Sequence, residues 1–192
     1  GQVTGYTDAT RGTQAFLWTP NSPHGATGSM VALDGAPSGF DYTAGTDINS
    51  LGQVVGAVGN RFAAQGQAFL WTPSSPNGTT GSMITLGGLP GGLEQSSANA
   101  INTHGQVVGV GVSDEFYDAA FLWTPTAPNG STGSMVSLGS LPGINNSRAE
   151  DINSQGQVVG FSEGFNEDST EEIVRAFVWT PLTPNGSAGG LV

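Results

Sequence analysis

The sequence feature that most constrains the fold is a repeat of about fifty residues. The segment Ala-Phe-Leu-Trp-Thr-Pro at 68–73 recurs, with at most one change, at 15–20, 120–125 and 176–181. The four tryptophans fall at the same place in these copies, at separations of 53, 52 and 56 residues: Trp18, Trp71, Trp123 and Trp179. Self-similarity at such a period indicates a repeat architecture. A second marker, Gly-Gln-Val followed by Val or Thr and Gly, sets the repeats at 1–51, 52–104, 105–155 and 156–192, the last one incomplete.

Each repeat predicts four short strands. In the second repeat they are the β-branched or apolar runs at 53–58, 68–71, 82–86 and 96–101, which are bounded by Gly, Pro and Asn. The segment Asn-x-x-Gly that begins at Asn49 fits a type I turn with a glycine bulge, so the fourth strand of one repeat and the first strand of the next form a hairpin. Four antiparallel strands per period of about 50 residues are typical of a propeller blade.

The second strand of each repeat is apolar on consecutive residues, Phe-Leu-Trp or Phe-Val-Trp. Because neighbouring residues of a strand point to opposite faces, both faces of this strand must be covered. Packing of one blade on the next does this, and it places the four tryptophans in the core. The sequence therefore predicts an all-β, β-propeller-like chain of four repeats, each a four-stranded antiparallel blade, with one strand missing from the set.

The repeats resemble a known family. The segments INSLGQVVG at 48–56, INTHGQVVG at 101–109 and INSQGQVVG at 152–160, together with AFLW and LGGLPGG at 86–92, look like the bacterial extracellular repeats named HAF. The histidine that gives that family its name is replaced here by Gln14, Gln67, Ala119 and Arg175. The resemblance implies a secreted or cell-surface repeat protein, and it supplies no reaction and no catalytic residues.

The count of strands is one short of four complete blades. The chain starts at the first strand of a repeat and ends at the third strand of a repeat. One strand equivalent to the fourth strand of a repeat, which we call a fourth-type strand, is therefore missing, either before Gly1 or after Val192. Three explanations stay open: a truncated or proteolysed chain, a strand supplied by another chain through β-augmentation, and a loop that covers the edge. For the second, the expected assembly edge is Gln2, Val3, Thr4, Leu191 and Val192.

Composition limits the partners. The chain has a formal net charge of −11, no lysine and four arginines, so it would repel nucleic-acid phosphates and anionic membrane surfaces. It has no cysteine, which excludes disulfides and thiolate metal sites. No apolar run is long enough to span a bilayer as a helix. Copies of the chain itself, and after them a glycan or a surface protein, are the partners that we expect.

The loop between the first and second strands varies most among the repeats, and in the third and fourth repeats it is acidic. Loops of differing length on a rigid scaffold are where binding usually lies. A carbohydrate- or calcium-binding role is the alternative function, set against a solvated loop that keeps the chain soluble. The candidate binding residues are Asp114, Glu115, Phe116, Tyr117, Asp118, Glu163, Phe165, Glu167, Asp168, Glu171 and Glu172.

Two further motifs are weak. The segment 160–164 matches Gly-x-Ser-x-Gly, but a nucleophile elbow needs a following helix and a histidine partner, and here a loop follows. The hairpins that begin at Asp47 and Asp151 resemble the start of a calcium loop without its later bidentate acid, so turn capping is the better interpretation. We therefore predict a non-enzymatic, secreted or cell-surface structural or interaction protein that self-assembles through its incomplete blade and has no cofactor.

Overall fold

The computed structural model describes all of the chain except residues 10–11, 61–62 and 166–170, and the described part consists of strands and loops without a helix. The strands are β1 (Val3–Ala9), β2 (Gly12–Pro20), β3 (Gly28–Ala32), β4 (Tyr42–Ile48), β5 (Val54–Asn60), β6 (Ala63–Pro73), β7 (Gly81–Gly87), β8 (Ser96–Ile101), β9 (Val107–Val112), β10 (Asp118–Pro125), β11 (Gly133–Ser137), β12 (Asn146–Ile152), β13 (Val158–Phe165), β14 (Glu172–Pro181) and β15 (Gly189–Leu191).

These strands form four antiparallel sheets, which we name I to IV in chain order. Sheet I has three strands in the order β1-β2-β3, and sheets II, III and IV have four each, in the orders β4-β5-β6-β7, β8-β9-β10-β11 and β12-β13-β14-β15. Each four-stranded sheet starts with a fourth-type strand and continues with the first three strands of the next repeat. The prediction of an all-β chain built from antiparallel sheets, with one strand fewer in one of them, is confirmed.

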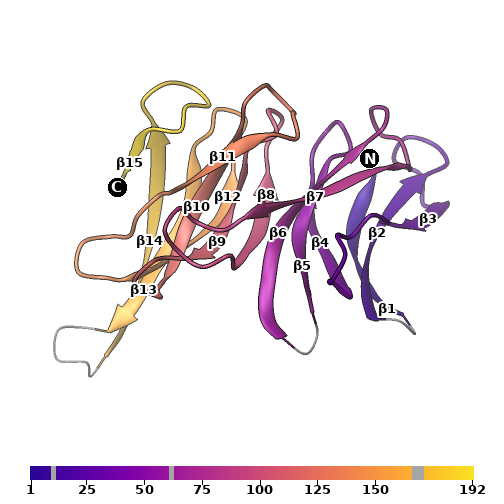
Figure 1. The fold of residues 1–192 in the computed structure, drawn as a ribbon. Helices are drawn as coiled ribbons and strands as arrows, with labels where there is room; N and C mark the ends of the chain where they lie inside the picture. The colour runs from indigo at the N-terminus through magenta and orange to yellow at the C-terminus, as the bar shows by residue number, and fades with distance from the viewer. Residues whose placement is uncertain (10–11, 61–62, 166–170) are drawn as a thin grey trace.

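The sheets follow one another in a row from sheet I at one end to sheet IV at the other, and the two terminal sheets lie at opposite ends of the molecule (Figure 1). The described residues form three buried hydrophobic clusters, and each cluster lies between two consecutive sheets. A closed ring of four sheets would bury a fourth cluster between sheets IV and I. The described sheets therefore make an open row and not a closed ring.

Neighbouring side chains along a strand point to opposite sides, so every sheet has two different faces, which we call the Trp face and the Leu face. The Trp face carries the tryptophan and the first valine of Gln-Val-Val, as in the register pair Val54 and Trp71. The Leu face carries the second valine and the residue before the tryptophan, as in the pair Val55 and Leu70. In each cluster the Leu face of one sheet packs on the Trp face of the next sheet. This is why both faces of the Phe-Leu-Trp strand are apolar.

The tryptophans differ in burial in a way that the repeat alone does not predict. Trp71, Trp123 and Trp179 are 2–3% exposed, as expected for core residues. Trp18 is only partly buried. It lies on the Trp face of sheet I, which has no preceding sheet to cover it, so the prediction that all four tryptophans are core residues is wrong for Trp18.

Two local expectations need adjustment. The second strand of each repeat continues through the proline and does not stop at the tryptophan; Pro73, for example, pairs with Gly81. The segment 171–175, which has no clear pattern in the sequence, enters β14 at Glu172 and pairs with β13. The first change lengthens the pairing of the second strand with the third, as in β6 with β7, and the second lengthens the central hairpin of sheet IV, β13 with β14. The topology is unaltered.

Candidate functional site

The two ends of the row expose side chains that are core residues elsewhere in the chain. On the Trp face of sheet I, Val3 is 49% and Met30 is 57% exposed, whereas their counterparts Val54 and Met83 in sheet II are 0% and 8% exposed. On the Leu face of sheet IV, Val159 and Val178 are 46% and 40% exposed, whereas the counterparts in sheet II, Val55 and Leu70, are both 0% exposed.

The two exposed faces are thus the two halves of the interface that the chain forms three times internally. Their exposure follows from the absence of a neighbouring sheet in the described structure, because the residue types hardly change. Terminal repeats of repeat proteins ordinarily carry polar outer faces that act as caps. Neither end of the described row is capped in this way.

A ladder of hydrogen bonds runs along one edge of the row and joins consecutive sheets through amide side chains. In sheet II, Nδ2 of Asn49 donates to Oε1 of Gln53 at 2.8 Å, and also to Asn102 O and Asn129 Oδ1 of sheet III, both at 3.3 Å. Nε2 of Gln53 donates to Thr72 Oγ1 at 3.3 Å and to Asn129 O at 3.0 Å. The ladder therefore links each turn to the sheet that follows it.

The same pattern recurs at the next junction. Nδ2 of Asn102 donates to Oε1 of Gln106 at 2.9 Å, to Asn153 O at 3.1 Å and to Asn185 Oδ1 at 3.4 Å. Asn49, Gln53, Asn102 and Gln106 are between 1% and 9% exposed. Buried amides of this kind stabilise the native state only when their donors and acceptors are satisfied, and here the next sheet satisfies them.

The ladder is incomplete at the N-terminal end. Gln2 occupies the place of Gln53, and its Nε2 donates to Thr19 Oγ1 at 2.8 Å and to Asn77 O at 3.0 Å, as the pattern requires. Its Oε1 is buried and has no hydrogen-bond partner in the described structure. Beside it lies a hollow of about 590 Å³, which is lined by Gln2, Thr19, Asn49, Asn77 and neighbouring residues of the adjoining turns.

The ladder also stops at the C-terminal end. Asn153 donates to Gln157 Oε1 at 2.9 Å, but it is exposed, whereas Asn49 and Asn102 are buried. A hollow of about 180 Å³ lies at this end, lined by Asp151, Ile152, Asn153, Gln157, Val159 and Val178. Asp47 is the equivalent of Asp151 in sheet II. Its carboxylate accepts a hydrogen bond at 2.8 Å from the backbone N–H of Ile101 in the next sheet.

The predicted assembly edge falls at two different places. Val3 and Thr4 begin β1, and Gln2 immediately precedes it; β1 pairs only with β2 among the described strands. Leu191 and Val192 lie at the end of the row, where β15 pairs with β14 and Val192 exchanges backbone hydrogen bonds with Val178. Because β15 has the edge position that β3, β7 and β11 also have, the missing strand belongs beside β1.

The acidic loops of sheets III and IV meet at Arg148. This residue of β12 forms an ion pair with Asp118 at 2.6 Å and lies 3.8 Å from Glu163, so it brings together carboxylates of two different sheets. Side-chain exposures of 33–40% place this group at the surface. The positive guanidinium lies between the two carboxylates and repels a second cation, so this group is better suited to joining sheets III and IV than to holding a metal ion.

The other predicted binding residues stay apart. Asp114, Glu115, Phe116 and Tyr117 form an exposed turn between β9 and β10, with Phe116 75% exposed. Phe165 ends β13, Glu172 begins β14 and Glu171 immediately precedes it, while Glu167 and Asp168 lie outside the described residues. Within the described part of the chain, no three acidic or histidine side chains are close enough to hold a metal ion.

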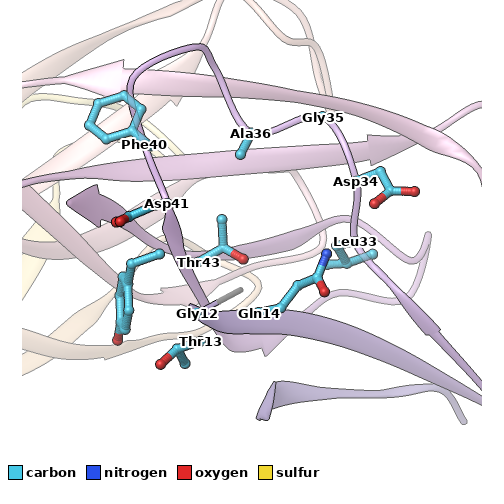
Figure 2. Close-up of a pocket in the computed structure, with 11 residues that line it drawn as sticks. Gly12, Thr13, Gln14, Leu33, Asp34, Gly35, Ala36, Phe40, Asp41 and Thr43 are labelled. Carbon is cyan, nitrogen blue, oxygen red and sulfur yellow. The ribbon is translucent and has the colours of Figure 1, made fainter. Parts of the chain in front are cut away.

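A further hollow, of about 280 Å³, opens between β2, the loop 33–41 and the start of β4 (Figure 2). Its two carboxylates, those of Asp34 and Asp41, lie on opposite sides and point away from each other. The hydroxyl of Thr43 at its floor accepts a hydrogen bond at 2.8 Å from the backbone N–H of Ala15. The polar groups therefore do not converge on one point, as they do in ligand sites.

The two weak motifs have structural roles. Ser162 of the Gly-x-Ser-x-Gly segment lies inside β13, is 0% exposed, and its Oγ accepts a hydrogen bond at 3.0 Å from the backbone N–H of Leu141. Asp47 and Asp151 each accept a hydrogen bond at 2.8 Å from the following backbone N–H, of Ile48 and Ile152. Both aspartates lie in strands, β4 and β12, so they do not cap the turn; the turns are capped by Asn49 and Asn153, whose Oδ1 atoms accept hydrogen bonds at 3.0 Å from the backbone N–H groups of Leu51 and Gln155.

No family model and no curated protein matches the chain. In the described residues, no helix has the length and apolarity that crossing a bilayer requires.

The sequence analysis missed the amide ladder and the hollow beside Gln2. A signal was present: Asn-x-x-Gly-Gln recurs at 49–53, 102–106 and 153–157, and the Asn-Gly turns lie at 77–78, 129–130 and 185–186. Each of these asparagines also fits an ordinary turn, so the residue pattern alone does not show that they contact the next sheet.

Proposed function

We propose that this chain is a non-enzymatic structural or interaction module, built of propeller-like repeats, that associates end to end with copies of itself. The resemblance to HAF repeats and the Gly-, Ser-, Thr- and Asn-rich surface support a place outside a bacterial cell or on its surface. The association joins the Leu face of sheet IV in one copy to sheet I of the next copy.

One observation carries this proposal. Val159 and Val178 at one end, and Val3 and Met30 at the other, are exposed, whereas their four counterparts at the junction of sheets II and III are 0–6% exposed: Val55, Leu70, Val107 and Met135. Burial of apolar surface contributes roughly 25 cal/mol per Å², and the packing of equivalent faces in the three interior clusters supports the proposed contact. A heterologous, head-to-tail contact of this kind extends into open filaments unless the rotation closes a ring.

The experiment is the native mass of the chain by light scattering after size exclusion, with negative-stain images of the same samples. We expect the wild type to form dimers and longer rows, and a variant with Val159→Asp and Val178→Asp to remain at the monomer mass of 19.4 kDa. The matched control is Leu182→Asp, because Leu182 is an apolar residue that is 81% exposed, and its counterparts in sheets II and III, Ser74 and Thr126, are also exposed although those sheets are covered. A wild type that stays monomeric at every concentration would refute the proposal.

A mixing experiment tests the polarity of the contact. The variant with Val159→Asp and Val178→Asp keeps its sheet I end, and a Met30→Asp variant keeps its sheet IV end. Mixed in equal amounts, the two should form a dimer and no longer species, whereas each alone stays monomeric. Dimers of either variant alone would show a symmetric contact and contradict the head-to-tail arrangement.

A further inference from the structure

The hollow beside Gln2 has the shape and polarity of a site that the chain fills at its interior junctions. In sheet II, the equivalent of Gln2 is Gln53, which binds the asparagine at the end of the neighbouring fourth-type strand, Asn49. Asn49 N donates to Gln53 O at 3.0 Å, Gln53 N donates to Asn49 Oδ1 at 3.1 Å, and Asn49 Nδ2 donates to Gln53 Oε1 at 2.8 Å. One glutamine thus recognises an asparagine through three hydrogen bonds.

The next sheet adds two acceptors to this recognition. Nδ2 of Asn49 also donates to the carbonyl of Asn102 and to Oδ1 of Asn129. At the N-terminal end the groups in the same places are the carbonyl of Asn49 and Oδ1 of Asn77, and both residues line the hollow together with Gln2. The acceptors for an asparagine amide are therefore assembled there, and the buried Oε1 of Gln2 has no partner in the described structure.

A glycine in β1 gives independent evidence that this edge is shaped for a strand. Gly56, Gly109 and Gly160 follow the Gln-Val-Val segments, and a Cβ at any of them would collide with a carbonyl oxygen of the fourth-type strand alongside. Gly5 holds the same position in β1, where the atoms nearest to an added Cβ would belong to the ring of Phe16, at 3.0 Å. The chain thus has at Gly5 the residue that a close-lying strand requires elsewhere.

We infer that the free edge of β1 and the hollow beside Gln2 together bind a β-strand that ends in Asp/Ala-Ile-Asn, with the asparagine seated in the hollow. The inference rests on the proposed function, because it names what completes the sheet I end. The interior sheets give the register: Ile48 opposite Val54, Asp47 opposite Val55, and, across a bulge, Gly45 opposite Gly56. The bound strand therefore places its isoleucine opposite Val3, the preceding residue opposite Thr4, and a Gly or Ala opposite Gly5.

This occupant differs from a generic edge strand in its terminal asparagine. Backbone pairing alone is sequence-tolerant, because every residue except proline offers the same N–H and C=O groups. Specificity comes from the side-chain amide of the terminal asparagine, which donates to Gln2 Oε1. An aspartate in place of this asparagine has no side-chain N–H, and an alanine leaves Gln2 Oε1 buried and unpaired. The chain carries the required sequence at 47–49, 100–102 and 151–153, and there each strand is paired within its own sheet.

The test uses the intact chain and a synthetic peptide with the sequence of residues 42–52, YTAGTDINSLG. Binding is measured by calorimetry, and hydrogen exchange of residues 3–9 reports whether the peptide lies along β1. We expect saturable binding and slower exchange in this segment. We expect the peptide with Asn49→Ala, or with Asn49→Asp, to bind at least about tenfold more weakly, because a buried acceptor then stays unsatisfied.

A protein variant checks the register. Gly5→Ala should weaken binding of the unaltered peptide at least about tenfold, because its methyl group lies where the carbonyl of the bound strand must be. A thermal melt of Gly5→Ala shows whether the free protein is still folded. Equal binding by the Asn49→Ala peptide, no effect of Gly5→Ala, or no binding of the unaltered peptide up to about 1 mM would each overturn the inference.

One further titration distinguishes failure of the strand site beside Gln2 from failure of the proposed end-to-end association. The peptide is titrated into the variant with Val159→Asp and Val178→Asp as well as into the wild type. Binding to this variant without self-association of the wild type supports the strand site and contradicts end-to-end assembly. Self-association of the wild type without peptide binding supports assembly and contradicts the strand site.

Discussion

The amide ladder predicts that one asparagine substitution has very different effects at two equivalent turns. Asn102 and Asn153 each begin the turn Asn-x-x-Gly-Gln, and each donates to its glutamine Oε1 at 2.9 Å and accepts from two backbone N–H groups of its turn. Asn102 is 4% exposed and also donates to the next sheet, whereas Asn153 is exposed at the end of the row. The comparison Asn102→Ala against Asn153→Ala therefore isolates the contribution of the neighbouring sheet.

The magnitude follows from the groups that are left behind. In Asn102→Ala, Oε1 and the backbone N–H of Gln106 lose a partner while Gln106 is only 1% exposed. Each buried unsatisfied group costs about 1–3 kcal/mol, so the free energy of unfolding should fall by about 2–6 kcal/mol. In Asn153→Ala, water replaces the lost partners and the loss should be about 1 kcal/mol or less.

The assay is chemical denaturation followed by tryptophan fluorescence, at a concentration where light scattering gives the monomer mass. A difference of about 2 kcal/mol between the variants also corresponds to about 4–8 °C in melting temperature for a chain of this size. Equal losses of stability in the two variants would refute the idea that the neighbouring sheet makes the amide ladder cooperative.

The remaining predictions use the same contrast between interior and end. Val55→Ala should lower the free energy of unfolding by about 2–3 kcal/mol, and Val159→Ala by less than about 1 kcal/mol, because only the first substitution removes methyl groups from a closed core. Denaturant titration measures both losses. Similar losses would contradict the open row of sheets. Gly56→Ala should destabilise the fold by more than about 4 kcal/mol, because the added methyl group meets the carbonyl of Ala44, whereas Gly5→Ala should destabilise it by about 1 kcal/mol. Thermal melts measure both effects. A small loss of stability in Gly56→Ala would argue against the close approach of β4. Arg148→Ala should cost at most about 1 kcal/mol in a denaturant titration, and the loss should shrink in high salt, because the side chains of its ion pairs are 33–40% exposed to solvent. A larger, salt-independent loss would assign Arg148 a packing role.

Much of the fold could be predicted because the signals are local and occur several times. Consecutive apolar residues in Phe69-Leu70-Trp71 require two covered faces, and the Gly, Pro and Asn residues between the runs mark the turns. The count of strand-forming segments likewise predicted that one strand is missing from the set. The first two inferences need only one repeat and its flanks, and the third needs only a count of the repeats, so none of them depends on how the sheets pack.

The features that the sequence did not predict depend on which sheets are neighbours in the folded chain. Val159 and Val55 occupy identical Gly-Gln-Val-Val-Gly segments, so no residue pattern distinguishes the exposed one from the buried one. The position of the missing strand beside β1 requires the pairing order of the sheets. Asp118 and Glu163 are candidate ligands in the sequence, and only the three-dimensional arrangement shows that Arg148 joins them.

The ends of the row and the charge of the chain act in opposite directions on association. With a formal net charge of −11, copies repel one another at long range, and salt screens this repulsion over about 8–10 Å. The exposed apolar residues Val3 and Met30 at one end and Val159 and Val178 at the other attract only at contact, where apolar surface leaves water. A chain adapted to remain solitary would carry charged or polar residues at these positions, since they bear no packing constraint when nothing covers them. Both terminal faces keep the residue types of the interior, as the proposed end-to-end association requires.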